Sequence, residues 1–259
     1  MQSAFDFSEI RDFLEEKYSY YNRQEFIKSD PIQIPHQFTD ERDIEISSFL
    51  TASIAWGRRV MIIRKAYELI QMMDNKPAEF LTNASLSDLQ KFNGFQYRTF
   101  LGVDTYYFLK SLQNIYNNYG GLKEVFESAY SETGSIKLTL IRFRKLFFSL
   151  DHHERTRKHV PDPENGAAAK RLNMFLRWMV RKDNRHVDFG IWKKIPTSNL
   201  LIPLDIHAGN VARKLGLLSR KQNDWKAVEE LTSRLRQFDP EDPSKYDFAL
   251  FGLGVFEGF

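Results

Sequence analysis

Apolar residues recur at helical spacing along most of the chain, and no stretch alternates between apolar and polar side chains as a half-buried strand does. Between Ser135 and Leu150, for example, Leu140, Phe143 and Phe147 fall on one helical face. The one apolar run without this period, residues 200–204, is too isolated to build a sheet. The pattern therefore predicts an all-α fold.

N-cap residues, glycines and prolines divide the chain into about ten helices. Ser8 and Asp40 are expected to cap the first two, and Gly216 to close the helix that Asp205 opens. With 259 residues and 42% apolar content, the chain suits one large domain or two lobes. We expect a single domain, residues 1–259, of two helical lobes with a cleft between them. The central lobe is predicted at about residues 41–200, and the second lobe at 1–40 together with 201–259.

The chain has no cysteine, which excludes disulfides, thiolate zinc sites, iron–sulfur clusters and a cysteine nucleophile. His152, His153 and His159 match no metal-ligand spacing, so we expect neither a metal nor a cofactor. The N-terminus lacks the apolar run of a signal peptide, and no stretch approaches the roughly 18 apolar residues that span a bilayer. We therefore expect a cytoplasmic protein with no membrane partner, and no protein partner is evident.

The basic residues are unevenly distributed. Residues 151–221 hold 15 Lys and Arg against 7 Asp and Glu, whereas the whole chain has a net charge of only +3. A basic segment on a mildly acidic body indicates a polyanionic partner, with nucleic acid as the first candidate. The alternative is an ordinary solvated charged face.

Lys170 opens the helix that carries the sequence KRLNMFLRWMV. There the backbone N–H groups create positive potential, so a partly buried amine could be held neutral and act as a nucleophile. Asp205 opens the helix IHAGNVARKL, where a carboxylate is an ordinary N-cap. A nucleophilic amine beside a fixed carboxylate is the minimum needed to attack a sugar anomeric carbon. The alternatives are a surface lysine at a helix start and a purely structural cap.

The segments GAAAKRLNMF and IPLDIHAGNVARKLGL resemble the catalytic half of the helix-hairpin-helix DNA glycosylase superfamily. The separation of 35 residues between Lys170 and Asp205 is similar to that in the archaeal 8-oxoguanine glycosylase branch. The chain also resembles a bacterial family of unknown function, which we place as a distant member of the same fold. The resemblance implies that Lys170 attacks C1′ of a damaged nucleotide to form a Schiff base, and that Asp205 assists base loss and β-elimination. Ala168 departs from the pattern, because a second glycine is expected there.

The resemblance also implies contacts with nucleic acid. FLTASIAWGRR is similar to the helix that lines the lesion pocket, so Trp56 is a candidate for stacking on a flipped base, although a core tryptophan is the alternative. The full set of predicted nucleic-acid contacts is Trp56, Arg58, Gly166, Arg171, Arg177, Arg181, His207 and Asn210.

The sequence thus predicts a DNA base-excision glycosylase with lyase activity that acts on one extruded, damaged nucleotide. A non-catalytic protein that keeps the fold and binds DNA or RNA is the alternative, and a helical protein-interaction scaffold is a third possibility. The lesion, the opposing base and the choice between DNA and RNA stay open.

Overall fold

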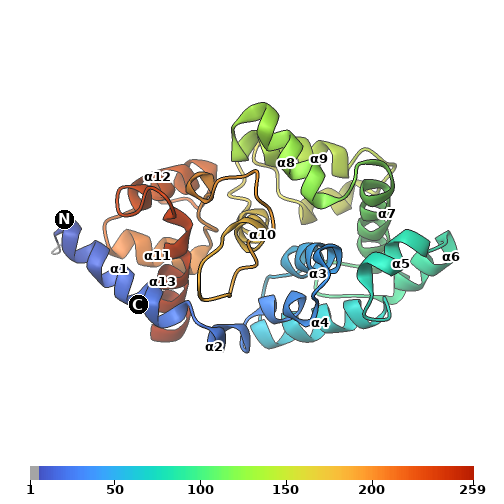
Figure 1. The fold of residues 1–259 in the computed structure, drawn as a ribbon, viewed down its shortest axis with the longest axis horizontal. Coiled ribbons are helices and arrows are strands. Elements are labelled where there is room, and N and C mark those ends of the chain that lie inside the picture. The colour runs from blue at the N-terminus through green and yellow to red at the C-terminus, as the bar shows by residue number, and fades with distance from the viewer. Residues whose placement is uncertain (1–5) are drawn as a thin grey trace. The chain divides into compact units, whose positions relative to one another are not determined.

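A computed structural model describes residues 6–259 and is helical in nearly every segment (Figure 1). Across this described range there is no β-strand, and the strand-like pairing is limited to two isolated bridges, Tyr97 with Phe100 and Ala167 with Asp224. The predicted all-α class is confirmed. The run at residues 200–204 is irregular, as its isolation led us to expect.

The chain divides into two compact units, which are described separately. One holds the described residues up to Phe26 together with Asp162–Phe259, and the other holds Ile27–Pro161. Residues 162–200 therefore group with the C-terminal helices, whereas the sequence analysis placed them in the central lobe. That the whole chain forms one domain stays a prediction.

The unit of residues 27–161 is built around an aromatic core. Phe49 lies 5.5 Å, between ring centroids, from both Phe143 and Phe147, and Phe108 lies 4.9 Å from Phe147. Asp40 caps the central helix as predicted, because its side chain accepts hydrogen bonds from the N–H groups of residues 42 and 43. The α-helices of this unit are α3 (Glu41–Ser53), α4 (Arg59–Gln71), α5 (Pro77–Asn83), α6 (Leu86–Gln90), α7 (Gly102–Asn118), α8 (Leu122–Thr133) and α9 (Ile136–Phe147).

The other unit packs its N-terminal helix against its C-terminal one, α1 against α13, and α13 in turn against α11 (Figure 1). Its core is formed mainly by aliphatic residues of α11, α12 and α13, such as Val211, Leu231 and Leu250, all fully buried. The α-helices of this unit are α1 (Phe7–Tyr21), α10 (Lys170–Val180), α11 (Ile206–Lys214), α12 (Trp225–Arg236) and α13 (Tyr246–Gly252), and the short α2 (Gln24–Ile27) lies at its boundary.

Asp6 caps α1, two residues before the predicted cap at Ser8. The Asp6 carboxylate accepts from the Phe7 N–H at 2.7 Å, and the Glu9 carboxylate accepts from the Asp6 N–H at 3.0 Å. The reciprocal contacts between Asp6 and Glu9, the third residue of the helix, form a capping box, and Ser8 instead donates its hydroxyl to Asp6.

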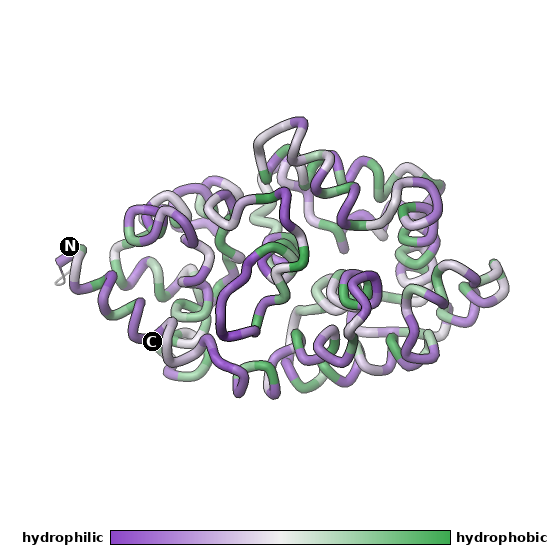
Figure 2. Tube along the Cα trace, viewed as in Figure 1, coloured by the Kyte–Doolittle hydropathy of each residue, from purple (hydrophilic) through white to green (hydrophobic). Residues whose placement is uncertain are grey.

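Hydrophobic and hydrophilic residues are mixed along the helices and do not form long separate runs (Figure 2). This pattern is typical of helices that bury one face and expose the other. Among the described helices, none has the length and apolar content required to cross a membrane.

Candidate functional site

Lys170 is the first residue of α10, in the first turn as predicted, and a tightly bent segment precedes it. Residues 163–166 form a turn, and Gly166 has φ +84°, a left-handed conformation that favours glycine. Ala169 also has a positive φ, +50°, which is costly for a residue with a Cβ atom. The Gly166 carbonyl accepts a hydrogen bond from the Trp225 N–H at 2.9 Å, so the segment is tied to the start of α12.

The Lys170 amine lacks a carboxylate in direct contact. Its side chain is half-buried, and its one hydrogen bond within residues 6–259 is a weak contact of 3.5 Å with the Met174 sulfur. No carboxylate of the described chain lies within ion-pair distance of Nζ. The amine is therefore not committed to a structural ion pair, unlike most half-buried lysines.

Asp205 caps α11, as predicted, and keeps one oxygen available. Oδ1 accepts from the Ala208 N–H at 3.0 Å, while the Asp205 carbonyl accepts from Asn223 Nδ2 at 3.1 Å. In the part of the chain that the structure describes, Oδ2 has no hydrogen-bond partner, and it is not among the polar atoms sealed from solvent. The carboxylate is thus rigidly held by one oxygen and accessible through the other.

Lys170 and Asp205 act on the same buried carboxyl, Asp247 of α13. Burial raises the pKa of Asp247 to about 6; the nearby charges of Arg177 and Lys170 act to lower that pKa, and those of Asp205 and Asp188 act to raise it. Electrostatic coupling of this kind requires that the charges lie near one another. Both predicted catalytic groups therefore influence the charge of Asp247, and all three belong to one compact unit.

Asp247 is a site residue that the sequence analysis missed. Its side chain is buried, and it accepts a hydrogen bond from Arg177. The available signal was an aspartate inside the otherwise apolar run YDFALFGLG. A charged residue in such a run is rarely buried without a partner of opposite charge.

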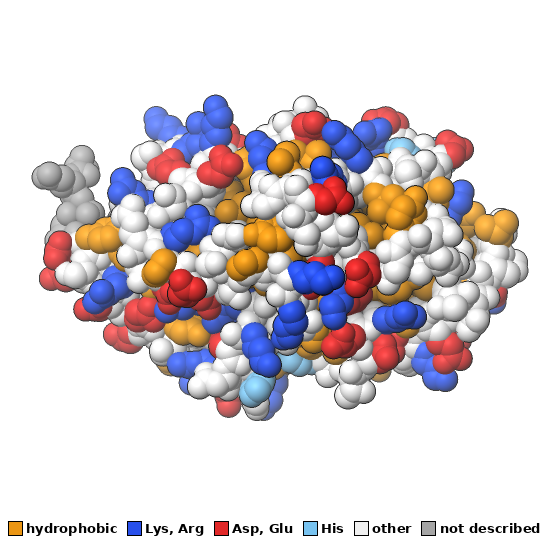
Figure 3. Space-filling view, turned by 45° about the horizontal axis from the view of Figure 1, so that its top comes forward, with side chains coloured by type: hydrophobic (Ala, Val, Ile, Leu, Met, Phe, Trp, Pro, Cys, Tyr) orange, Lys and Arg blue, Asp and Glu red, His pale blue; other side chains and the backbone are white. Residues whose placement is uncertain are grey.

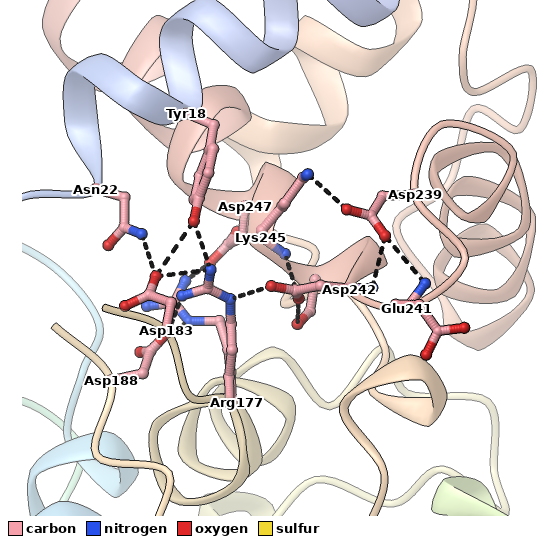
Figure 4. A network of polar contacts seen from close by, with 12 residues as sticks. Tyr18, Asn22, Arg177, Asp183, Asp188, Asp239, Glu241, Asp242, Lys245 and Asp247 are labelled. Carbon is pink, nitrogen blue, oxygen red and sulfur yellow. Dashed lines mark hydrogen bonds and ion pairs between the residues drawn. The ribbon is translucent and has the colours of Figure 1, made fainter. Parts of the chain in front are cut away.

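Arg177 and Arg181 belong to a buried network of ion pairs rather than to an open surface. Figure 4 shows Arg177 of this network together with Asp188, Asp242 and Asp247. Arg177 Nε donates to Asp188 at 3.2 Å, and Arg181 donates to Asp188 at 3.0 Å and to Asp242 at 2.8 Å. Arg181 Nη2 also donates to the Tyr18 hydroxyl at 2.9 Å. These contacts give both arginines a structural role, and we do not propose that they contact nucleic acid.

The remaining predicted residues of this unit lie at or near the surface. His207 and Asn210 are exposed on α11, close to Asp205 in the chain. Arg171 keeps part of its side chain exposed, although burial of the guanidinium lowers its pKa to about 10. Gly166 is half-buried, and a Cβ atom added there would meet no neighbouring atom within 4 Å.

Trp56 and Arg58 lie in the unit of residues 27–161. The Trp56 ring stacks on His159, with 5.7 Å between centroids and 24° between planes, and its carbonyl accepts from the Tyr97 hydroxyl at 2.6 Å. Trp56 is half-buried. Arg58 is exposed immediately before α4 and makes no side-chain capping bond.

His159 is also part of a buried polar cluster that the sequence analysis did not predict. Its Nε2 lies 3.3 Å from the carboxylate of the fully buried Asp104, which also accepts from the Thr156 hydroxyl at 2.7 Å and from Arg155. Burial acts to raise the pKa of Asp104, but the close contact with His159 and the hydrogen bonds from Thr156 and Arg155 hold that pKa well below its usual range. The cluster fixes the 3₁₀ helix Glu154–His159 against α7.

Some of the basic residues that predicted a basic surface are buried instead. Arg177 and Arg181 form ion pairs with Asp247 and Asp242, two carboxylates that lie outside residues 151–221. On the face drawn in Figure 3, Lys and Arg side chains stand among Asp and Glu side chains. Within residues 6–259, no three His, Asp or Glu side chains are grouped so as to hold a metal ion.

The comparison with protein families gives one match that covers most of the chain. The model described as "Protein of unknown function (DUF2400)" matches residues 30–256, which include both Lys170 and Asp205. No curated protein and no solved structure matches the chain.

Proposed function

Because the chain belongs to the DUF2400 family, whose function is unknown, we propose a function from its site: excision of damaged DNA bases by a glycosylase with lyase activity. A helix-hairpin-helix glycosylase-like fold with a cleft for the extruded base is part of this proposal. The observation that supports it is an amine without a carboxylate contact, Lys170, and a carboxylate with one oxygen free of hydrogen bonds, Asp205, each of which influences the charge of the buried Asp247.

In the proposed reaction the neutral Lys170 amine attacks C1′ of the extruded nucleotide. A bond forms between Nζ and C1′, and the glycosidic bond breaks, so that its electron pair leaves with the base, which then takes a proton from water. The attached nitrogen gives a proton to Asp205, its lone pair expels O4′, and Asp205 returns the proton to O4′. The product is a protonated Schiff base between Nζ and C1′.

The lyase step follows from the same intermediate. The Asp205 carboxylate takes a proton from C2′, the electron pair of that C–H bond forms a double bond between C2′ and C3′, and the C3′–O bond breaks so that the phosphate leaves with its electron pair. Water then hydrolyses the Schiff base and restores the Lys170 amine. The position of Asp205 at the N-terminus of α11 suits these steps, because it keeps one carboxylate oxygen fixed and the other free.

Borohydride trapping tests this proposal. A duplex that contains 8-oxoguanine and a second that contains a preformed abasic site are incubated with the protein and sodium borohydride, which reduces a Schiff base to a stable amine. We expect a covalent protein–DNA adduct, mapped to residue 170 by mass spectrometry and absent in Lys170→Ala. Lys226→Ala is the matched control, since Lys226 is an exposed lysine in the first turn of another helix, α12. Absence of an adduct from both duplexes, and from a panel of other base lesions, overturns the proposal.

The alternative is a protein that binds DNA or RNA without catalysis, and the segment before Lys170 favours it. Gly166 is the single glycine there, and Ala168 and Ala169 carry methyl groups where a backbone would approach a phosphate closely. Salt-sensitive binding of intact duplex or single-stranded RNA, with no adduct on any lesion, supports this alternative. No affinity for either nucleic acid at low salt indicates an interaction scaffold.

A further inference from the structure

Arg98, an exposed arginine of the unit of residues 27–161, has a backbone conformation that is costly for a residue with a Cβ atom. Its φ is +53°, in the left-handed region. Arg98 lies in a tight turn in which Tyr97 and Phe100 exchange two backbone hydrogen bonds, at 2.8 and 2.9 Å. Glycine or asparagine would adopt this conformation at lower cost. The backbone of the turn therefore does not favour arginine, and the reason for it lies in the side chain.

The Arg98 side chain packs against the backbone of Gly57, in the segment between α3 and α4. A Cβ atom added at Gly57 would collide with Arg98 Nη1, and it would lie 3.3 Å from Arg98 Cδ and 3.0 Å from the Tyr97 hydroxyl. That hydroxyl donates to the Trp56 carbonyl at 2.6 Å, which ties the turn to the same segment. Gly57, with φ +98°, thus leaves room for the guanidinium of Arg98.

The 3₁₀ helix of residues 154–159 also holds this turn. Arg155 Nη2 donates to the Thr99 carbonyl at 2.9 Å, while Arg155 Nη1 donates to the buried Asp104. The turn is therefore fixed at Tyr97 and at Thr99, on both sides of Arg98. A guanidinium that is held in this way loses little conformational freedom when it binds a ligand.

The two segments that meet at Gly57 and Arg98 are basic. Residues 54–67 and 92–103 contain four arginines and one lysine, and they contain no Asp or Glu. Arg58, which follows Gly57 directly, is exposed like Arg98, and within residues 6–259 neither side chain forms an ion pair. Their charges are therefore available to a negatively charged ligand. This basic surface lies outside residues 151–221, where the sequence analysis expected one.

We propose that Arg98 and Arg58 bind a phosphate group of a nucleic-acid backbone. The planar guanidinium of Arg98 can donate two hydrogen bonds to phosphate oxygens, and Arg58 adds a second positive charge. Such contacts position a protein on a strand without reading its sequence. A binding role also accounts for the turn, since strained backbone is retained where it aims a functional side chain. The inference rests on nucleic acid as the partner, which the proposed function requires.

The test uses Arg98→Gly, which removes the guanidinium and places at this position a residue that adopts a positive φ freely. We expect its urea midpoint to equal or exceed that of the wild type. Its affinity for a fluorescein-labelled duplex without a lesion should fall by about 10-fold at low salt, equally for unrelated sequences. The slope of log affinity against log salt concentration should decrease in magnitude by about 1.

Arg142→Ala is the matched control, because Arg142 is an exposed arginine of the same unit that pairs with Glu132. Its affinity for the duplex should change by no more than about 2-fold. Fluorescence anisotropy measures the duplex, and phosphorus NMR measures the binding of inorganic phosphate to the wild type and to Arg98→Gly.

Duplex binding that is unchanged in Arg98→Gly overturns the inference, even if borohydride traps an adduct at Lys170. If Arg98→Gly instead abolishes saturable binding of inorganic phosphate and leaves duplex binding unchanged, the ligand is free phosphate and the assignment to a nucleic-acid backbone is wrong. Weaker duplex binding in Arg98→Gly, with no adduct on any lesion, supports the inference and counts against the DNA-excision proposal.

Discussion

Arg181 and Asp188 form an ion pair, Nη1 to Oδ2 at 3.0 Å, in which both side chains are fully buried. Arg181 holds Asp242 and the Tyr18 hydroxyl at the same time, so one guanidinium joins α1, α10 and the segment before α13. The charges of Arg181 and Asp188 are shielded from water, so the network stabilises the fold only if each buried charge has a partner of opposite sign.

Replacement of Arg181 by alanine is expected to lower the free energy of unfolding by about 3–5 kcal/mol, because Asp188 and Asp242 would keep buried charge with fewer partners. Arg142→Ala is the control, since Arg142 pairs with Glu132 where both side chains are about half exposed; its cost should be at most about 1 kcal/mol. Urea unfolding of both variants makes the comparison. A similar small loss in the two would show that the buried network contributes little.

The Asp205→Asn variant distinguishes the helix-capping role of Asp205 from its proposed role in proton transfer. Asparagine caps a helix about as well as aspartate, so the free energy of unfolding should change by less than about 0.5 kcal/mol, whereas the adduct rate should fall by about 100-fold or more. Asp224→Asn is the matched control, because Asp224 caps α12 through the same geometry, from Ala227 N–H at 3.1 Å. Borohydride trapping and urea unfolding measure the two effects. If Asp205→Asn forms adducts as fast as Asp224→Asn, Asp205 is only a cap.

Features that depend on nearby residues could be predicted from the sequence. Helical spacing gave the all-α class, and the caps at Asp40 and Asp205 and the start of α10 at Lys170 followed from local residue types. The burial of Arg177 and Arg181 could not be predicted in this way. Their partners include Asp242 and Asp247, 61 and 70 residues away, and helical periodicity contains no information on such pairs.

Gly166→Ala is expected to destabilise the protein by about 1 kcal/mol or more, because φ at Gly166 is +84° and a Cβ atom disfavours that conformation. A steric clash does not contribute to this loss of stability, since the added Cβ would meet no atom within 4 Å. Gly94→Ala provides the control: its Cβ would also meet nothing, but its φ is not positive, so a change within about 0.5 kcal/mol is expected. Thermal or urea unfolding compares the two, and equal effects would rule out backbone strain at Gly166.

Asp104 should make the unit of residues 27–161 sensitive to acid. Although burial acts to raise the pKa of Asp104, the close contact with His159 and the hydrogen bonds from Thr156 and Arg155 lower it overall. The stabilisation is therefore present above the unfolded-state pKa of about 3.9 and is lost as the pH falls toward the lower folded-state value. Urea midpoints at neutral and acidic pH should show a difference between wild type and Asp104→Asn that shrinks below about pH 4. Asp151→Asn, at an exposed aspartate of the same unit, should show no such change.

The hydrogen bond from the Trp225 N–H to the Gly166 carbonyl, beside the bridge between Ala167 and Asp224, makes the Trp225 amide sensitive to the position of the segment before Lys170. The Trp225 amide can exchange with deuterium only when the segment before Lys170 detaches from α12. Its exchange rate therefore measures how often the segment that leads into Lys170 opens, and a ligand that binds this segment should slow the exchange of that one amide.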